Sequence, residues 1–265
     1  MLILPPLQIV EVVLFAVFLA FLTVRYIRHP ALMKKNLLEF PASSFLGAIP
    51  ISLNTIVQGF ISYYDYRPSA RWAAFVIYWI CLVLSLLVAM ALITVQMINA
   101  KEQELKDVAG IWVMTTVPLF STALTAGNIL PYLNTESTKC AIAVLVTGFM
   151  CFALGLSLLT FILAAYFFRL IANKLPPQPL LAASFLPAAA LAQGGLGIHR
   201  LSVYFALYIK AYGFGPTQDA PPPIPLTTLQ STSEVMHWLG ILMNLALLAH
   251  ATFCTLIGSS ARSHC

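Results

Sequence analysis

Three apolar stretches of the chain are each interrupted by one proline, and these prolines recur at nearly regular intervals. Pro50, Pro118 and Pro187 are separated by 68 and 69 residues. A proline inside a helix removes one backbone hydrogen bond and presses its ring against the preceding turn, at a cost of about 3 kcal/mol. In a bilayer, the freed carbonyl needs a partner from protein or from an aqueous cavity. The repeat therefore predicts three inner helices around a shared polar path, each backed by an unbroken outer helix.

The composition is that of an integral membrane protein. Apolar residues make up 60% of the chain and charged residues 9%, and the mean hydropathy is +0.89. A soluble domain has about 25% charged residues. We predict an all-α membrane protein with one transmembrane domain over residues 1–265. Its seven predicted spans are Leu7–Tyr26, Phe45–Tyr63, Trp72–Met97, Gly110–Leu130, Ala141–Ile171, Leu180–Ile209 and Val235–Ser259.

Basic residues fall unequally on the two sets of loops that join these spans. One set has nine and the other five, and the positive-inside bias places the richer set in the cytoplasm. This topology explains the net charge of +5 without nucleic acid as a partner. Residues 210–233, rich in Pro, Gly, Thr and Ser, are predicted to form an extracellular loop. The richer set is Arg25, Arg28, Lys34, Lys35, Lys101, Lys106, Arg169, Lys174 and Arg262; the other is Arg67, Arg71, Lys139, Arg200 and Lys210.

The polar residues suggest passage of an ion rather than catalysis. The sequence has no HExxH motif, no Ser/His/Asp set and no phosphate-binding glycine loop. We therefore disfavour an enzyme and assign no metal ligand and no cofactor. Hydroxyls, amides and the N–H groups of kinked helices can partly replace the hydration shell of an anion without holding it tightly. The candidate substrate-binding residues are Pro50, Asn54, Pro118, Thr122, Thr125, Pro187, Gln193, Gly194 and Gly195.

The same small residues have a second interpretation. Ser, Thr and Gly in membrane helices often serve close helix packing, and a hydroxyl can satisfy a carbonyl that a kink has freed. Gly194, Gly195 and Gly197 are compatible with close backbone approach or with a flexible segment at a pore. Their clustering on the proline-interrupted spans favours a pore for the set as a whole.

A resemblance to a known family extends from about Leu7 to Ser259. The stretch KLPPQPLLAASFLPAAALAQGGLGI (Lys174–Ile198) resembles one in the fungal sulfite efflux pumps, which reads Leu-Pro-Pro, Ser-Phe-Leu-Pro and Gly-Gln-Gly-Gly-Phe-Gly-Ile. Weaker similarity is found in SSFLGAIP and in GIWVMTTVPLFSTALTAG. These pumps belong to the tellurite-resistance/dicarboxylate transporter family, with the fungal malic acid transporters and the plant guard-cell slow anion channels.

The resemblance implies a fold of ten helices in five hairpins, with kinked inner helices around a pore, often as a homotrimer. On that alignment the chain corresponds to helices two through eight, without the first inner helix and the last hairpin. One departure concerns the stretch after Pro187. The pumps have Pro-Leu-Gly-Pro-Leu-Gly where this chain has PAAALA. Helix-favouring residues thus replace two glycines and a proline, which bears on pore shape and substrate choice.

These observations lead to one functional hypothesis and several alternatives. The hypothesis is transport of small anions across the plasma membrane, with sulfite efflux as the leading activity. The alternatives are transport of a C4-dicarboxylate such as malate, an anion channel, or a truncated and non-functional paralogue, because the chain begins and ends with an outer-type span. The expected partners are a small inorganic or organic anion and the lipid bilayer.

Overall fold

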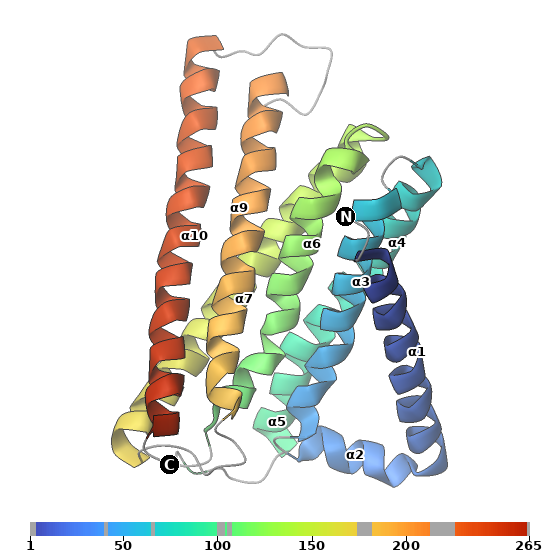
Figure 1. Cartoon of the computed structure of the whole chain (residues 1–265), viewed down its shortest axis with the longest axis vertical. Helices are drawn as coiled ribbons and strands as arrows, with labels where there is room; N and C mark the ends of the chain where they lie inside the picture. Colours follow the sequence, from blue (N-terminus) through green and yellow to red (C-terminus); the bar gives the residue numbers. More distant parts are fainter. Residues whose placement is uncertain are drawn as a thin grey trace.

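The computed structural model describes residues 4–39, 42–64, 67–99, 104, 108–173, 182–212 and 226–263. Within these ranges the chain forms helices and no strand, which confirms the predicted all-α fold class. Most helices run along one long axis, and α2 lies across one end of the bundle (Figure 1). The α-helices are α1 (Leu4–Arg28), α2 (Pro30–Leu38), α3 (Ala48–Tyr64), α4 (Pro68–Leu86), α5 (Ile93–Asn99), α6 (Val117–Leu133), α7 (Thr138–Asn173), α9 (Leu186–Tyr212) and α10 (Leu226–Ser263). The remaining segments are three 3₁₀ helices, η1 (Ala42–Gly47), η4 (Gly110–Thr115) and η5 (Ala182–Phe185), and the π-helix η2 (Leu87–Leu92).

Each of the seven predicted spans corresponds to one helical segment. In order, these are α1, η1 with α3, α4 with η2 and α5, η4 with α6, α7, η5 with α9, and α10. Among the described residues, five segments are long and apolar enough to cross a membrane, and those containing α6 and α9 are not among the five. The α6 helix has only 17 residues, and α9 includes the polar stretch from Gln193 to Arg200. The α6 helix is therefore excluded by its length, whereas its neighbour α9 is excluded by its polar residues.

Two predictions about the end of the sixth span are wrong. The α9 helix continues to Tyr212 and α10 begins at Leu226, so both ends of the predicted loop 210–233 are helical. Its middle part, residues 213–225, lies outside the described residues. Arg200 was expected in a loop and instead lies in the middle of α9. The helix continues because no proline or glycine follows Arg200 before Tyr212.

The three repeated prolines lie where a 3₁₀ segment gives way to an α-helix. Pro50 is the third residue of α3, and Pro118 and Pro187 are the second residues of α6 and α9. In the first turn of an α-helix, the missing N–H of proline has no intrahelical partner to lose. The prolines therefore start the α-helices rather than kink them at mid-length, and the interruption lies nearer one end of the span than expected.

The middle 3₁₀ segment, η4, packs against the other two. Segment η4 contacts both η1 and η5, and two glycines make this approach possible. A Cβ atom at Gly47 of η1 would overlap the backbone carbonyl of Met114 in η4, and one at Gly110 would overlap that of Ala183 in η5. All three repeated prolines are buried. The repeat seen in the sequence is thus a repeat of local structure whose units meet in space.

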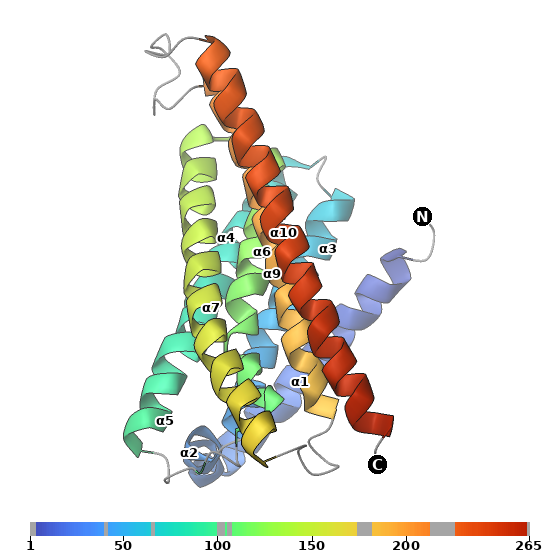
Figure 2. The same cartoon turned by 90° about the vertical axis from the view of Figure 1, so that its left-hand side faces the viewer.

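The α6 helix is at the centre of the bundle. It buries nearly all of its residues and contacts α3, α4, α7 and α9. The predicted third span is continuous, but it includes the π-helical turn η2, which contacts η1, η4 and α6. In contrast, α1 leans away from the bundle at one end and has no buried residue in its most apolar window (Figures 1 and 2). The proline-bearing helices therefore lie side by side, with the more apolar helices around them.

We predict that Gly47→Ala destabilises the protein, because the added methyl group meets a backbone carbonyl that cannot rotate away. Overpacking of this kind costs about 1–3 kcal/mol. The measurement is the midpoint of thermal unfolding in detergent. Gly59→Ala, on α3, is the matched control, because a Cβ atom there meets only the flexible end of the Gln8 side chain. An equal loss of stability in the two variants would contradict the proposed contact between η1 and η4.

Candidate functional site

Equivalent side chains bind the proline carbonyls in the first two repeats. Asn54 lies four residues after Pro50, and its Nδ2 donates to the Pro50 carbonyl at 2.9 Å. Thr122 lies four residues after Pro118, and its hydroxyl donates to the Pro118 carbonyl at 2.9 Å. The two side chains also bind each other, because Asn54 Nδ2 donates to Thr122 Oγ1 at 3.1 Å. The third repeat has the buried Leu191 in this position.

The pairing extends to α4 and along α3. Ser85 of α4 lies 2.8 Å from Thr122 Oγ1, and it is the donor because Thr122 gives its only proton to Pro118. Farther along, Gln58 Nε2 donates to Thr125 Oγ1 at 2.8 Å, and Thr125 donates to the Ser121 carbonyl. Asn54, Ser85, Thr122 and Thr125 are fully buried. We call the five side chains Asn54, Gln58, Ser85, Thr122 and Thr125 the polar seam.

The polar seam holds three helices together. The Thr122 hydroxyl accepts from Asn54 and from Ser85 and donates to Pro118, so both of its lone pairs and its proton are used. This matches the packing interpretation of the small polar residues. Other polar atoms near the proline-bearing helices remain without a hydrogen bond. Three buried atoms have no hydrogen-bond partner among the described residues: Asn54 Oδ1, Ser121 Oγ and Gln193 Oε1. A buried polar atom without a partner costs about 1–3 kcal/mol, so these atoms mark places where water or a ligand would be stabilised.

The glycines of α9 allow close approach to its neighbours. A Cβ atom at Gly194 would lie 2.9 Å from the Phe120 ring of α6, and one at Gly197 would lie 3.2 Å from the backbone nitrogen of Leu124. A Cβ atom at Gly195 would lie 2.5 Å from Asn244 Oδ1 of α10. Gly194 and Gly197 thus face α6, whereas Gly195 faces α10. Since all three lie within one continuous helix, the alternative of a flexible segment receives no support from their placement.

Arg200 is a charged residue in the middle of the otherwise apolar α9. Gly127 of α6 provides the space beside it, since a Cβ atom there would overlap the Arg200 Cβ. The Arg200 side chain is exposed, and it forms no hydrogen bond or ion pair within the described part of the chain. An arginine at membrane depth without a protein partner typically faces a water-filled cavity or an ion path. Arg200 is therefore the strongest candidate for contact with an anion.

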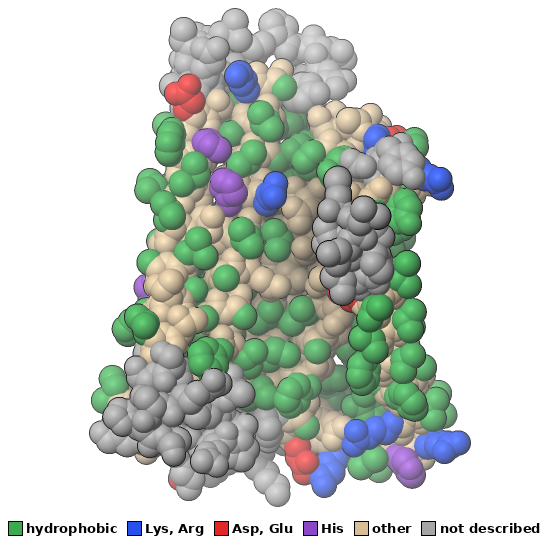
Figure 3. Space-filling view, viewed as in Figure 1, with side chains coloured by type: hydrophobic (Ala, Val, Ile, Leu, Met, Phe, Trp, Pro, Cys, Tyr) green, Lys and Arg blue, Asp and Glu red, His purple; other side chains and the backbone are tan. Residues whose placement is uncertain are grey.

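A pair of histidines lies next to Arg200, which takes part in neither of the described ion pairs. Its neighbour His199 lies against His237 of α10, with ring centroids 6.3 Å apart. In Figure 3, a basic side chain and two histidine side chains lie together over α9 and α10, and the surface is hollowed between α9 and α3. An exposed guanidinium beside such a hollow can attract and orient an anion through its fork of N–H donors.

The structure brings some of the predicted site residues together and separates others. Asn54 and Thr122 are hydrogen-bonded, Thr125 is bound to Gln58, and the three prolines lie at the adjoining junctions. Gly194 lies against α6, and Gly195 is turned toward α10. Whether any of the nine binds substrate stays a prediction.

Sequence reasoning missed two members of the polar seam and misplaced Arg200. Gln58 could have been predicted from the sequence, because it lies four residues after Asn54 and therefore on the same helix face. Ser85 could not have been predicted, because it lies on an outer span without a proline.

Comparison with known proteins places the chain in a group of anion transporters. A family model described as voltage-dependent anion channel, SLAC1, matches residues 6–263. The chain is 26% identical over 201 residues to the sulfite efflux pump SSU1 of Trichophyton rubrum, with 74% of this chain and 52% of the relative covered. It is 27% identical over 214 residues to the sulfite efflux pump SSU1 of Arthroderma otae, with coverage of 75% and 55%. The chain thus spans about half the length of these relatives. No solved structure matches it.

We predict that Thr122→Val destabilises the protein by about 1–3 kcal/mol, because the change keeps the shape but leaves Asn54 and Ser85 without their shared partner. Stability is measured as the thermal unfolding midpoint of detergent-purified protein. The matched control is Thr55→Val on the same helix as Asn54, where the exposed hydroxyl binds only the Ile51 carbonyl. In a double-mutant cycle with Asn54→Leu, the two losses should not add. Full additivity would contradict the polar seam.

Proposed function

Because the chain belongs to the SLAC1 family of voltage-dependent anion channels, we propose that it moves small anions across the plasma membrane, with sulfite as its substrate. The relatives at 26–27% identity are sulfite efflux pumps, and this supports sulfite as the first anion to test. The arrangement of a homotrimer with one path per subunit is proposed on the same family resemblance.

The single observation that supports this proposal most strongly is Arg200, an exposed charge in the middle of α9 that lies against Gly127 of α6 and has no ion-pair partner among the described residues. Gln193 lies seven residues before Arg200, hence two turns away on the same face of α9, at a distance of about 10 Å along the helix axis. Gln193 is half-exposed and Arg200 is exposed. An anion moving along this face would meet a neutral amide and a guanidinium in succession. One mobile charge and one neutral donor bind weakly enough for release.

The polar seam has a different role in this proposal. Its hydroxyls are occupied by one another, so it fixes the spacing of α3, α4 and α6 rather than coordinating the anion through Thr122. The residues Pro50, Asn54, Pro118, Thr122, Thr125, Pro187, Gly194 and Gly195 then shape the wall, and Gln193 and Arg200 supply the contacts.

A compact oxyanion suits this face better than a dicarboxylate. A guanidinium can bind one oxyanion with two parallel hydrogen bonds. Malate has a carboxylate at each end, and Arg200 and Lys210, ten positions apart, are the only Lys or Arg residues on α9. The second carboxylate would therefore lose hydration without a Lys or Arg of α9 as its partner.

We predict that Arg200→Gln lowers the initial rate of sulfite flux roughly tenfold, the effect of losing one charge-assisted hydrogen bond. Flux is measured in proteoliposomes at equal protein content. Arg200→Lys should keep part of the rate, because the positive charge remains but the paired N–H donors are lost. Lys210→Gln, which removes an equal charge near the end of the same helix, is the matched control and should leave the rate unchanged. Undiminished flux in Arg200→Gln would contradict the role of Arg200.

We predict that sulfite crosses faster than malate, and that expression of the chain raises sulfite tolerance in cells lacking their own exporter. The readouts are initial flux rates for sulfite, nitrate, chloride and malate, together with growth at increasing sulfite. Faster malate than sulfite flux would overturn the substrate assignment and leave anion transport in place. Absence of flux for every anion, from protein that is folded in the bilayer, would instead support the non-functional paralogue.

A further inference from the structure

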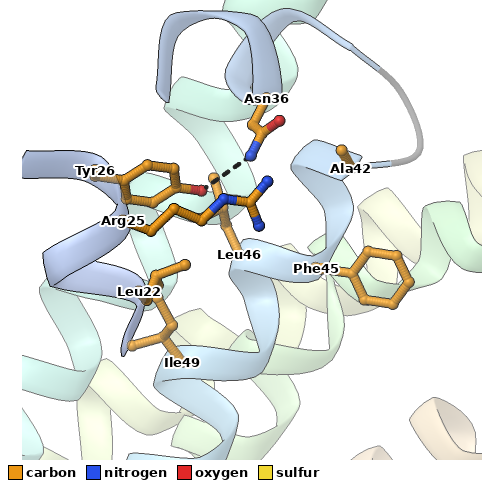
Figure 4. Close-up of a pocket in the computed structure, with 8 residues that line it drawn as sticks. All are labelled: Leu22, Arg25, Tyr26, Asn36, Ala42, Phe45, Leu46 and Ile49. Carbon is orange, nitrogen blue, oxygen red and sulfur yellow. Dashed lines mark hydrogen bonds between the residues drawn. The ribbon is translucent and has the colours of Figure 1, made fainter. Parts of the chain in front are cut away.

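A cavity of about 430 Å³ lies where α1, α2 and η1 meet. These elements form a triangle at one end of the bundle, because α2 crosses from the end of α1 to the start of η1 (Figure 1). Part of the lining is apolar and part is polar, and Figure 4 shows the arrangement. The lining residues are Leu22, Arg25, Tyr26, Asn36, Ala42, Phe45, Leu46 and Ile49.

The polar groups of the cavity are concentrated on one side. Asn36 Nδ2 donates to the Tyr26 hydroxyl at 3.3 Å, which links α2 to α1. The Arg25 guanidinium lies beside this pair and points across the cavity toward η1 (Figure 4). Arg25 forms no ion pair with any described carboxylate. The cavity therefore offers one cationic donor above walls formed by Leu22, Leu46 and Ile49.

The cavity lies at the level where a membrane surface is expected. Beyond Arg25, the exposed residues include the basic Arg28 and Lys35. On the other side of Arg25, α1 exposes a long apolar surface that includes Phe18 and Phe21. A helix that ends in basic residues and is followed by a short transverse helix is typical of the junction between hydrocarbon and headgroups. The cavity opens at this junction.

A second cavity lies farther along the same two helices. It measures about 330 Å³ and is lined mainly by apolar and aromatic side chains of α1 and α3, among them Val12, Ile56 and Phe60. Val12 precedes Arg25 by 13 positions, which corresponds to about 20 Å along a helix. An acyl chain that starts at Arg25 is long enough to extend toward it between the two helices.

We infer that the cavity beside Arg25 binds an anionic phospholipid, with the phosphate on the Arg25 guanidinium and an acyl chain between α1 and α3. Arginine binds phosphate oxygens through paired N–H donors. A free inorganic anion would lose hydration against Leu22, Leu46 and Ile49 with a single cation in return, which is unfavourable. A lipid offsets this cost by covering the same apolar walls and the exposed surface of α1.

The test is retention of lipid by the full chain purified in detergent with equal amounts of phosphatidylglycerol and phosphatidylcholine, measured by native mass spectrometry. The wild-type protein should retain phosphatidylglycerol preferentially. Arg25→Gln should reduce that preference roughly tenfold, and Arg25→Lys should keep most of it. Arg28→Gln is the matched control, because Arg28 lies one turn farther on α1 and does not line the cavity; its effect should be about twofold at most.

A second variant tests the cavity itself. Ala42→Trp fills the space while leaving every charge in place, and it should also abolish the preference. Equal losses in Arg25→Gln and Arg28→Gln would show diffuse attraction to a basic surface and overturn the site. Displacement of the lipid by millimolar inorganic phosphate would show a free-anion site, and would overturn the assignment to a lipid. If Ala42→Trp retained as much phosphatidylglycerol as the wild-type protein, the cavity would not be the binding site, and the proposal would be overturned.

Discussion

The close packing of the 3₁₀ segment η4 against η1 and η5 is the contact on which the rest of the fold depends. Gly47 and Gly110 have no side chain, and their backbones therefore lie against the carbonyls of Met114 and Ala183. This approach sets where α3, α6 and α9 begin and places Pro50, Pro118 and Pro187 in equivalent first turns. From these starts the helices run side by side, with α6 in contact with both α3 and α9.

The distribution of polarity follows from that geometry. The α6 helix can hold Ser121, Thr122 and Thr125 because neighbouring helices surround it and exclude lipid. Hydrogen bonds to Asn54, Gln58 and Ser85 then satisfy most of this polar content. Since a buried group that is already bonded has little left to offer a passing ion, direct contact with an anion falls to the residues that the packing leaves open. On α9 these are the half-exposed Gln193 and the exposed Arg200.

The two unpaired arginines have different surroundings and therefore different proposed ligands. Arg200 lies on α9 beside Gly127 of α6 and next to the His199–His237 pair, and its proposed ligand is a small anion. Arg25 lies above apolar walls at the end of α1, a helix held to α3 by few contacts, among them the hydrogen bond from Gln8 Nε2 to the Ile56 carbonyl at 3.1 Å. Charge alone does not distinguish these sites; the polarity of the neighbouring walls does.

The sequence by itself determined the fold class, the seven spans and the repeat, because apolar length and regularly spaced prolines are properties of local chain chemistry. It placed Asn54 and Thr122 among the candidate residues because both are polar and lie close to a repeated proline. Only the tertiary structure decided that these two side chains bind each other, that Ser85 joins them from an outer helix, and that Gly194 faces α6 while Gly195 faces α10. It also settled the position of Arg200, which the sequence analysis had both included in the sixth span and counted with the loops. Each of these results depends on which helix faces contact each other. Those contacts are set by packing between segments that are far apart in the chain.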